Sequence, residues 1–122
     1  MQPLAIVYYE RLMPGSQLVN KLQDISYRVL TLNKPDLLAP SACREMPMIV
    51  FTELGANDEV LAAIEKIKAD STTNHIPVVV FAPDNRPALL DAAQKTGVSL
   101  AVSDSVLLNH LPQLIEQALQ VE

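Results

Sequence analysis

Two short runs of this sequence are apolar at every position and rich in β-branched residues. They are Pro47-Met-Ile-Val-Phe51 and Ile76-Pro-Val-Val-Val-Phe81. A strand with one face in water alternates polar and apolar side chains, whereas a strand covered on both faces is apolar throughout. Both runs have strand length, so they predict central strands of a parallel sheet with helices on each face.

Three further runs, 4–9, 27–32 and 98–102, also have the length and composition of strands. Helical periodicity fills the intervals between the strand runs. The apolar residues that we expect on the buried faces of helices are Leu18, Val19, Leu22, Ile25, Val60, Leu61, Ile64, Ile67, Leu89, Leu90, Ala93, Leu111, Leu114, Ile115 and Leu119. Strands that alternate with helices through short loops are typical of βαβ units.

Helix ends are marked by polar residues and by proline. Asn57 is the expected N-cap of the third helix, and Asp84 or Asn85 of the fourth, with Gly97 at the end of that helix. The last helix is expected to start at Asn109. In the segment 35–45, one proline can open a helix and a second interrupts it, so a short, broken or partly 3₁₀ segment is expected there.

The pattern predicts one domain over 1–122, an α/β fold with a three-layer, doubly wound, five-stranded parallel sheet of order 2-1-3-4-5. In such sheets ligands bind at the carboxyl ends of the strands, where the winding reverses. The residues expected around that crevice are Tyr8, Tyr9, Glu10, Thr52, Glu53, Ala82 and Asp104.

Composition excludes several classes of protein. The formal net charge of −5 argues against a broad nucleic-acid surface. No apolar run is long enough to span a bilayer, and the first residues do not resemble a signal peptide. Cys43 is the only cysteine, which fits a reducing, cytoplasmic environment. We therefore expect no membrane and no nucleic-acid partner.

No catalytic or metal-binding constellation stands out. His75 and His110 lie far apart without carboxylate or cysteine neighbours at ligand spacing, so no metal and no cofactor is expected. Cys43 is expected to have a half-buried, small apolar role. Arg86 could present its charge to an anionic ligand near a helix start, although helix capping explains its polar neighbours equally well. The chain is not expected to be an enzyme.

The order and spacing of these elements resemble the receiver domain of bacterial response regulators, the CheY-like family. The likeness covers essentially the whole chain and is carried by Ile6-Val7, Tyr27-Arg28-Val29, Pro47-Met-Ile-Val-Phe51, Ile76-Pro77-Val-Val-Val80 and Gly97-Val98. It implies a phosphorylation site in which an acidic pair binds Mg²⁺ and an aspartate accepts the phosphoryl group. A hydroxyl residue and a lysine would then hold the phosphoryl oxygens.

Laid onto this sequence, those positions depart from the family pattern. Tyr8 and Tyr9 stand at the acidic pair, Glu53 at the acceptor and Asp104 at the lysine. Two alanines, Ala82 and Ala101, replace the hydroxyl residue and a switch aromatic. A shift of one residue would bring Glu10 to the metal position. Without these charges, phosphoryl transfer lacks its electrostatic stabilisation. The resemblance therefore implies a degenerate pseudo-receiver that acts through protein–protein contacts.

Its working surface would be the last helix–strand–helix region, around Ala101, with Leu107 and Leu108 exposed as a dimer or partner patch. Two other functions stay open: a small ligand-binding or enzymatic flavodoxin-like domain, and an atypical receiver that is still phosphorylated. Glu53 is either a built-in phosphate mimic or a solvated loop carboxylate. Tyr8 and Tyr9 either stack on a planar ligand or, as we favour, lie one in the core and one half-exposed.

Overall fold

The computed structural model describes residues 3–54, 59–84, 86–96 and 98–120. The elements, in chain order, are β1 (Leu4–Tyr8), α1 (Leu12–Asp24), β2 (Arg28–Leu32), a 3₁₀ turn (Pro35–Leu37), α2 (Leu38–Glu45), β3 (Ile49–Glu53), α3 (Glu59–Ala69), β4 (Val78–Ala82), α4 (Pro87–Gln94), β5 (Leu100–Ser103), α5 (Asp104–Asn109) and α6 (Leu111–Gln120). Within these described residues, none of the helices has the length and apolar character needed to cross a membrane.

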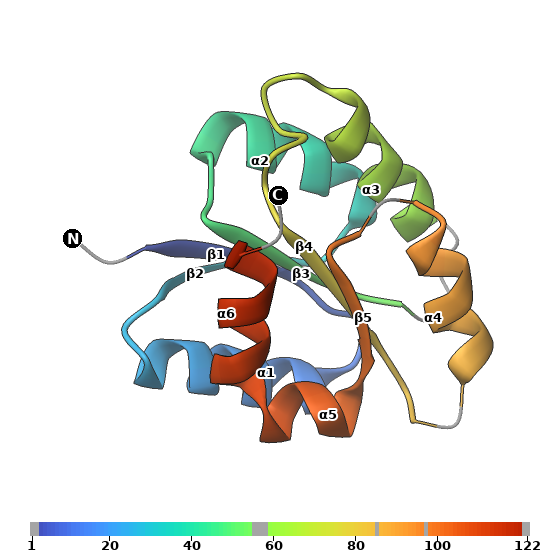
Figure 1. The fold of residues 1–122 in the computed structure, drawn as a ribbon. Helices are drawn as coiled ribbons and strands as arrows, with labels where there is room; N and C mark the ends of the chain where they lie inside the picture. The colour runs from blue at the N-terminus through green and yellow to red at the C-terminus, as the bar shows by residue number, and fades with distance from the viewer. Residues whose placement is uncertain (1–2, 55–58, 85, 97, 121–122) are drawn as a thin grey trace.

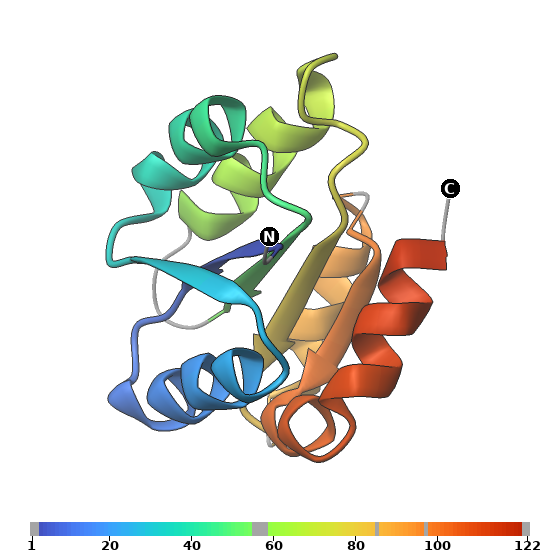
Figure 2. The ribbon, with the colours of Figure 1, turned by 90° about the vertical axis from the view of Figure 1, so that its left-hand side faces the viewer.

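The five strands form one parallel sheet in the order β2-β1-β3-β4-β5, which confirms the predicted fold class. Figures 1 and 2 show the sheet as the middle layer between two groups of helices. Every residue of β3 and of β4 is buried, as their continuous apolar composition predicts. Both edge strands, β2 and β5, are only half-buried along most of their length.

Alternation along the strands divides the core into two clusters. Val50 and Val80 belong to the cluster beneath α2, α3 and α4, whereas Phe51 and Phe81 belong to the cluster beneath α1, α5 and α6. Successive side chains of a strand point to opposite faces, so each central strand supplies both layers. This arrangement brings the carboxyl ends of all five strands to one edge of the sheet.

The helix assignments are partly corrected. Ile25 follows the last residue of α1 and is 39% exposed, and Leu119 is 40% exposed, because Ala118 takes the inward position on α6. The short helix α5 was not expected from the sequence; it precedes α6, which begins at Leu111 rather than Asn109. The expected broken segment at 35–45 is confirmed as a 3₁₀ turn followed by α2. Cys43 of α2, expected to be half-buried, is instead exposed.

The predicted N-cap of α4 is wrong. Arg86 is the N-cap residue of α4, and its side chain makes no capping hydrogen bond within the described part of the chain. Asp84, the expected cap, instead accepts hydrogen bonds from Ser105 at the start of α5. Asn57, Asn85 and Gly97 lie outside the described residues.

The start of α1 is shaped by Pro14. The preceding residue, Met13, has extended dihedral angles inside the helix boundary (φ −105°, ψ 119°), because the proline ring disfavours the helical conformation of the residue before it. Leu12 and Met13 are therefore turned out toward solvent, at 70% and 57% exposure. The segment between β1 and the regular part of α1 thus runs over the carboxyl edge of the sheet.

Gly15 allows this segment to lie close to the sheet. A Cβ atom at position 15 would come within 2.3 Å of two ring atoms of Tyr9. Glycine to alanine in a helix ordinarily stabilises by about 1 kcal/mol. Here we expect Gly15→Ala to destabilise the protein by about 1–2 kcal/mol instead, because the ring lies half-buried against α1. Thermal unfolding measures the effect, and Asn20→Ala on the exposed face of α1 is the control. A rise in stability for Gly15→Ala would contradict the close approach.

Candidate functional site

The crevice predicted at the carboxyl edge of the sheet is occupied by charged side chains from the end of β3, the β1–α1 segment and the start of α5. Tyr8, Glu53 and Ala82 are the last residues of β1, β3 and β4, and Asp104 directly follows β5. These four residues therefore lie at the same edge, as the predicted strand order required. Glu10 and Arg11 belong to the segment that links β1 to α1.

Glu53 is the centre of this site. Its side chain is 1% exposed. Carboxylate oxygen Oε1 accepts hydrogen bonds from the backbone N–H groups of Glu10 (2.7 Å) and Arg11 (3.1 Å), and Oε2 accepts one from Nε of Arg11. Both oxygens are thus engaged by donors of the β1–α1 segment. Of the two alternatives for Glu53, the solvated loop carboxylate is therefore wrong, because Glu53 ends β3 and its side chain is buried beneath this segment.

Arg11 joins two acidic residues that are distant in sequence. Besides its contact with Glu53, its Nη2 atom donates a hydrogen bond to Oδ2 of Asp104 at 2.7 Å. Burial alone would lower the pKa of Arg11, but the hydrogen bonds to Glu53 and Asp104 outweigh it and raise that pKa above its ordinary value. The guanidinium group stays positively charged, and its planar fork suits two carboxylates at once.

Two polar atoms near this edge are buried without a hydrogen-bond partner in the described part of the chain. They are Oδ1 of Asp104 and Oγ1 of Thr52. Thr52 pairs in register with Tyr8 of the neighbouring strand and is fully buried in β3. Among the described residues, the Asp104 carboxylate thus pairs with Arg11 through Oδ2, while its other oxygen has no partner.

The two tyrosines behave as the core interpretation predicts. Tyr8 is 1% exposed and belongs to the cluster beneath α2, α3 and α4, whereas Tyr9 is half-buried against α1. The hydroxyl of Tyr8 donates a hydrogen bond to Oε2 of Glu10 at 2.9 Å. Burial first, and then this bond to Glu10, raise the pKa of Tyr8 far above its usual range, so the phenol stays neutral.

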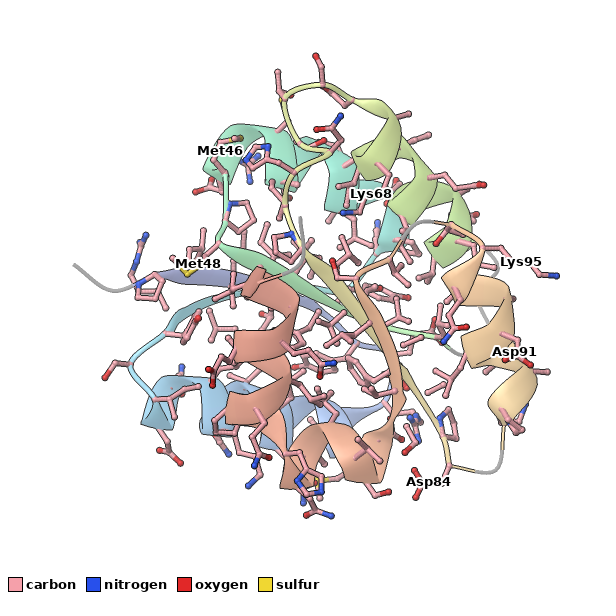
Figure 3. All side chains as sticks on the ribbon, viewed as in Figure 1. Met46, Met48, Lys68, Asp84, Asp91 and Lys95 are labelled. Carbon is pink, nitrogen blue, oxygen red and sulfur yellow. The ribbon has the colours of Figure 1, made fainter. Side chains whose placement is uncertain are left out.

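A second polar contact ties the β4–α4 loop to α5. Asp84 accepts hydrogen bonds from the backbone N–H of Ser105 (3.2 Å) and from its hydroxyl (2.7 Å). These bonds hold the pKa of Asp84 below its ordinary value. Figure 3 places Asp84 at the end of the sheet where α5 begins, and Met48 at the opposite end. The first two residues of α5 are thus each bonded to another segment: Asp104 to Arg11 of the β1–α1 segment, and Ser105 to Asp84 of the β4–α4 loop.

The predicted partner surface is corrected at one position. Leu107 is fully buried in the cluster beneath α1, α5 and α6, because α5 turns this side chain toward the sheet. Leu108 is half-buried, and Ala101 in β5 is half-buried against the opposite cluster. The exposed apolar residue of α5 is Val106, at 40%. Leu107 therefore cannot form part of an exposed patch in this conformation.

Sequence reasoning missed Arg11. The sequence places Tyr8, Tyr9, Glu10, Thr52, Glu53, Ala82 and Asp104 around the crevice but gives no role to Arg11, the residue that follows Glu10. The available signal was a basic residue shortly after the first strand, in a chain whose other expected crevice charges are acidic.

The donors present do not fit a resident Mg²⁺ ion. Magnesium prefers charged oxygen ligands and water. Here Tyr8 is a neutral phenol that donates to Glu10, and the oxygens of Glu53 already accept three N–H groups. Among the described residues, no group of three or more His, Cys, Asp or Glu side chains is arranged to hold a metal ion.

Two surface hollows flank the site. One, of about 380 Å³, is lined by Arg11, Met13, Gln17, Pro83, Asp84, Asp104, Ser105 and Leu108. The other, of about 460 Å³, is lined by Tyr9, Glu10, Leu12, Thr31, Leu32 and Asn33. Glu53 lines neither of them, because Arg11 and the backbone of the β1–α1 segment cover it. A third cavity, of about 500 Å³, lies away from this edge, between α2 and α3.

The strand order matches the flavodoxin-like fold of CheY-type receiver domains. The receiver domain of the sensor histidine kinase PA1611 from Pseudomonas aeruginosa, solved with magnesium in its active-site cleft, superposes with a TM-score of 0.85 at 12% identity over 99% of this chain and 100% of that domain. The receiver domain of a modulated diguanylate cyclase from Desulfovibrio desulfuricans gives 0.78 at 16% identity, over 98% and 94%.

NtrX from Brucella abortus, solved with ADP, gives a TM-score of 0.82 at 18% identity; the match covers 98% of this chain but only 26% of NtrX. At these identities the likeness concerns the fold. No protein-family model matches the sequence, and no curated protein matches it. The receiver fold predicted from the sequence is thereby confirmed.

Proposed function

We propose that this chain, 1–122, is a receiver-like module of bacterial two-component-type signalling that works through protein–protein contacts and takes no part in phosphoryl transfer. The fold supports a signalling role by its likeness to receiver domains of sensor kinases and other regulators. The observation that carries the proposal is Arg11: the chain's own guanidinium lies between Glu53 and Asp104, in the crevice where a receiver needs a metal ion and a free carboxylate.

The chemistry of Glu53 supports the same conclusion. To accept a phosphoryl group, a carboxylate oxygen must approach the phosphorus atom in line with the leaving group. Both oxygens of Glu53 are engaged by N–H donors, and the side chain is 1% exposed. Asp104 adds a second negative charge, which would repel a phosphoryl donor. With Ala82 in place of a hydroxyl residue, the edge offers no donor there for the phosphoryl oxygens.

Incubation with acetyl phosphate and Mg²⁺ tests the proposal. We expect no gain of phosphoryl mass by intact-protein mass spectrometry, and no change in the amide spectrum on addition of beryllofluoride with Mg²⁺. The Glu53→Asp variant is the matched control. It places at position 53 the aspartate that receivers use as acceptor, one methylene shorter than glutamate, and leaves Arg11 unchanged. Phosphorylation of Glu53 in the parent protein would refute the proposal and favour the atypical phosphorylated receiver.

A ligand-binding or enzymatic domain is a weaker candidate. It requires a formed pocket in which polar groups converge. The hollows of the crevice lie beside Glu53 rather than over it, and the central carboxylate is covered by protein. A cytoplasmic location, a protein partner and a homodimer remain predictions; light scattering at high protein concentration tests the last of these. The phosphate-mimic role of Glu53 is tested by the amide spectrum of Glu53→Gln.

A further inference from the structure

The inference concerns how α5 is attached to the sheet. The helix spans only Asp104–Asn109, and its N-cap residue Ser103 makes no side-chain capping bond among the described residues. Its first residue, Asp104, is held by Arg11, and its second, Ser105, by Asp84. Two side chains from opposite sides of the crevice therefore fix the start of the helix.

We infer that Arg11 is a latch that holds α5 against the sheet, so that its release from Asp104 lets α5 move and uncovers Leu107. The inference rests on the proposed function, because a module without phosphorylation needs another way to alter its protein-binding surface. Arg11 contacts Glu53 and Asp104 through different nitrogen atoms of one rigid group, so a single side chain couples β3 to α5. In this role Arg11 is a positioning residue.

Electrostatics give the latch two states. Glu53 and Asp104 contact the same guanidinium, so they are close neighbours. With Arg11 between them both charges are compensated; once Arg11 leaves Asp104 and stays on Glu53, the Asp104 carboxylate has lost its cation, and one of its oxygens is already buried with no partner in the described residues. Asp104 is the carboxylate that can move, because Glu53 also accepts two backbone N–H groups.

The ion pair with Asp104 is the weaker half of the latch. The side chain of Arg11 is 42% exposed and that of Asp104 is 16% exposed, whereas that of Glu53 is 1% exposed. Water and salt weaken an exposed pair more than a buried one. Release is therefore expected first at Asp104, with Arg11 still bound to Glu53. The contact between Asp84 and Ser105 would then act as the pivot of the moving helix.

The consequence for the surface lies in three consecutive apolar residues. Val106 is exposed, Leu107 is buried, and Leu108 is half-buried. Outward movement of α5 would expose Leu107 in addition to the already exposed Val106 and the half-buried Leu108. The surface predicted from the sequence around Leu107 and Leu108 is thus a property of the released state rather than of the latched state.

Amide hydrogen exchange of the full chain, read at 104–109, tests the latch. We expect Asp104→Ala, which leaves the pair between Arg11 and Glu53 intact, to raise exchange in α5 about tenfold while β3 and β4 stay unchanged. The control is Asp91→Ala, which removes an exposed carboxylate from α4 (Figure 3). Unchanged exchange in α5 of Asp104→Ala would overturn the inference.

A double-mutant cycle separates the latch from a local effect on the helix start. Arg11→Lys keeps a positive charge beside Glu53 but lacks the fork that reaches Asp104, so it should also raise exchange in α5. If both variants break one interaction, the double variant exchanges no faster than the faster single variant. Additive effects would overturn the latch. Either result is independent of the acetyl phosphate test, so the latch and the proposed function can fail separately.

Discussion

Arg11→Ala is expected to lower the free energy of unfolding by about 2–4 kcal/mol, because it leaves the buried carboxylate of Glu53 without its cation. The loss is placed below that of a fully buried pair, because Arg11 is partly exposed and Glu53 keeps two backbone N–H donors. Denaturant unfolding followed by circular dichroism measures the change.

Two further variants identify the cause of this loss. Arg44→Ala removes an exposed arginine of α2 that pairs with its neighbour Glu45, and is expected to change stability by less than about 0.5 kcal/mol. In the double variant Arg11→Ala/Glu53→Gln, a neutral amide replaces the unpaired charge, so part of the lost stability should return. A loss below about 1 kcal/mol for Arg11→Ala would mean that the crevice tolerates an unpaired Glu53, and would remove the main support for the proposed function.

Leu107→Ala is expected to destabilise the protein by about 2–5 kcal/mol, the cost of deleting a fully buried leucine side chain. This result would distinguish a core residue from a member of an exposed partner patch, where the same change costs little. Chemical denaturation again supplies the measurement, with the slope of the transition checked for two-state behaviour.

Leu108→Ala is the matched control for this prediction. Leu108 is the next residue of the same helix and is half-buried, so its truncation should cost clearly less than that of Leu107. Equally small effects of the two variants, below about 1 kcal/mol, would show that α5 does not keep Leu107 inside in solution. That outcome would also favour the exposed surface first predicted from the sequence.

Most of the fold could be predicted, because it follows from local patterns. Continuous apolar runs identified β3 and β4, and two prolines predicted the broken helix before β3. Two of the errors concern which apolar residues of a helix face the core: the sequence predicted Ile25 and Leu119 to be buried, and both are exposed. A periodicity does not show where its helix stops or which of two neighbouring apolar residues faces inward.

The sequence predicted where the site residues lie, but not that Arg11 pairs with two of them. Tyr8, Glu53 and Asp104 lie at the predicted edge, since strand order follows from the alternation of strands and helices. The role of Arg11 could not be predicted, because its two partners are 42 and 93 residues away in sequence. A long flexible side chain has several accessible rotamers, and only the surrounding loops select one of them.

The amino-acid sequence by itself determined most of the strands and helices, how they alternate, and that Tyr8, Glu53 and Asp104 meet at one edge of the sheet. Only the tertiary structure decided that Glu53 is buried rather than solvated, that Arg11 compensates it, and that Leu107 faces the core. The physical reason is one of range. Hydrophobic periodicity can be recognised from residues that are close in sequence, whereas the partner of a charged side chain depends on which distant segments the folded sheet brings together.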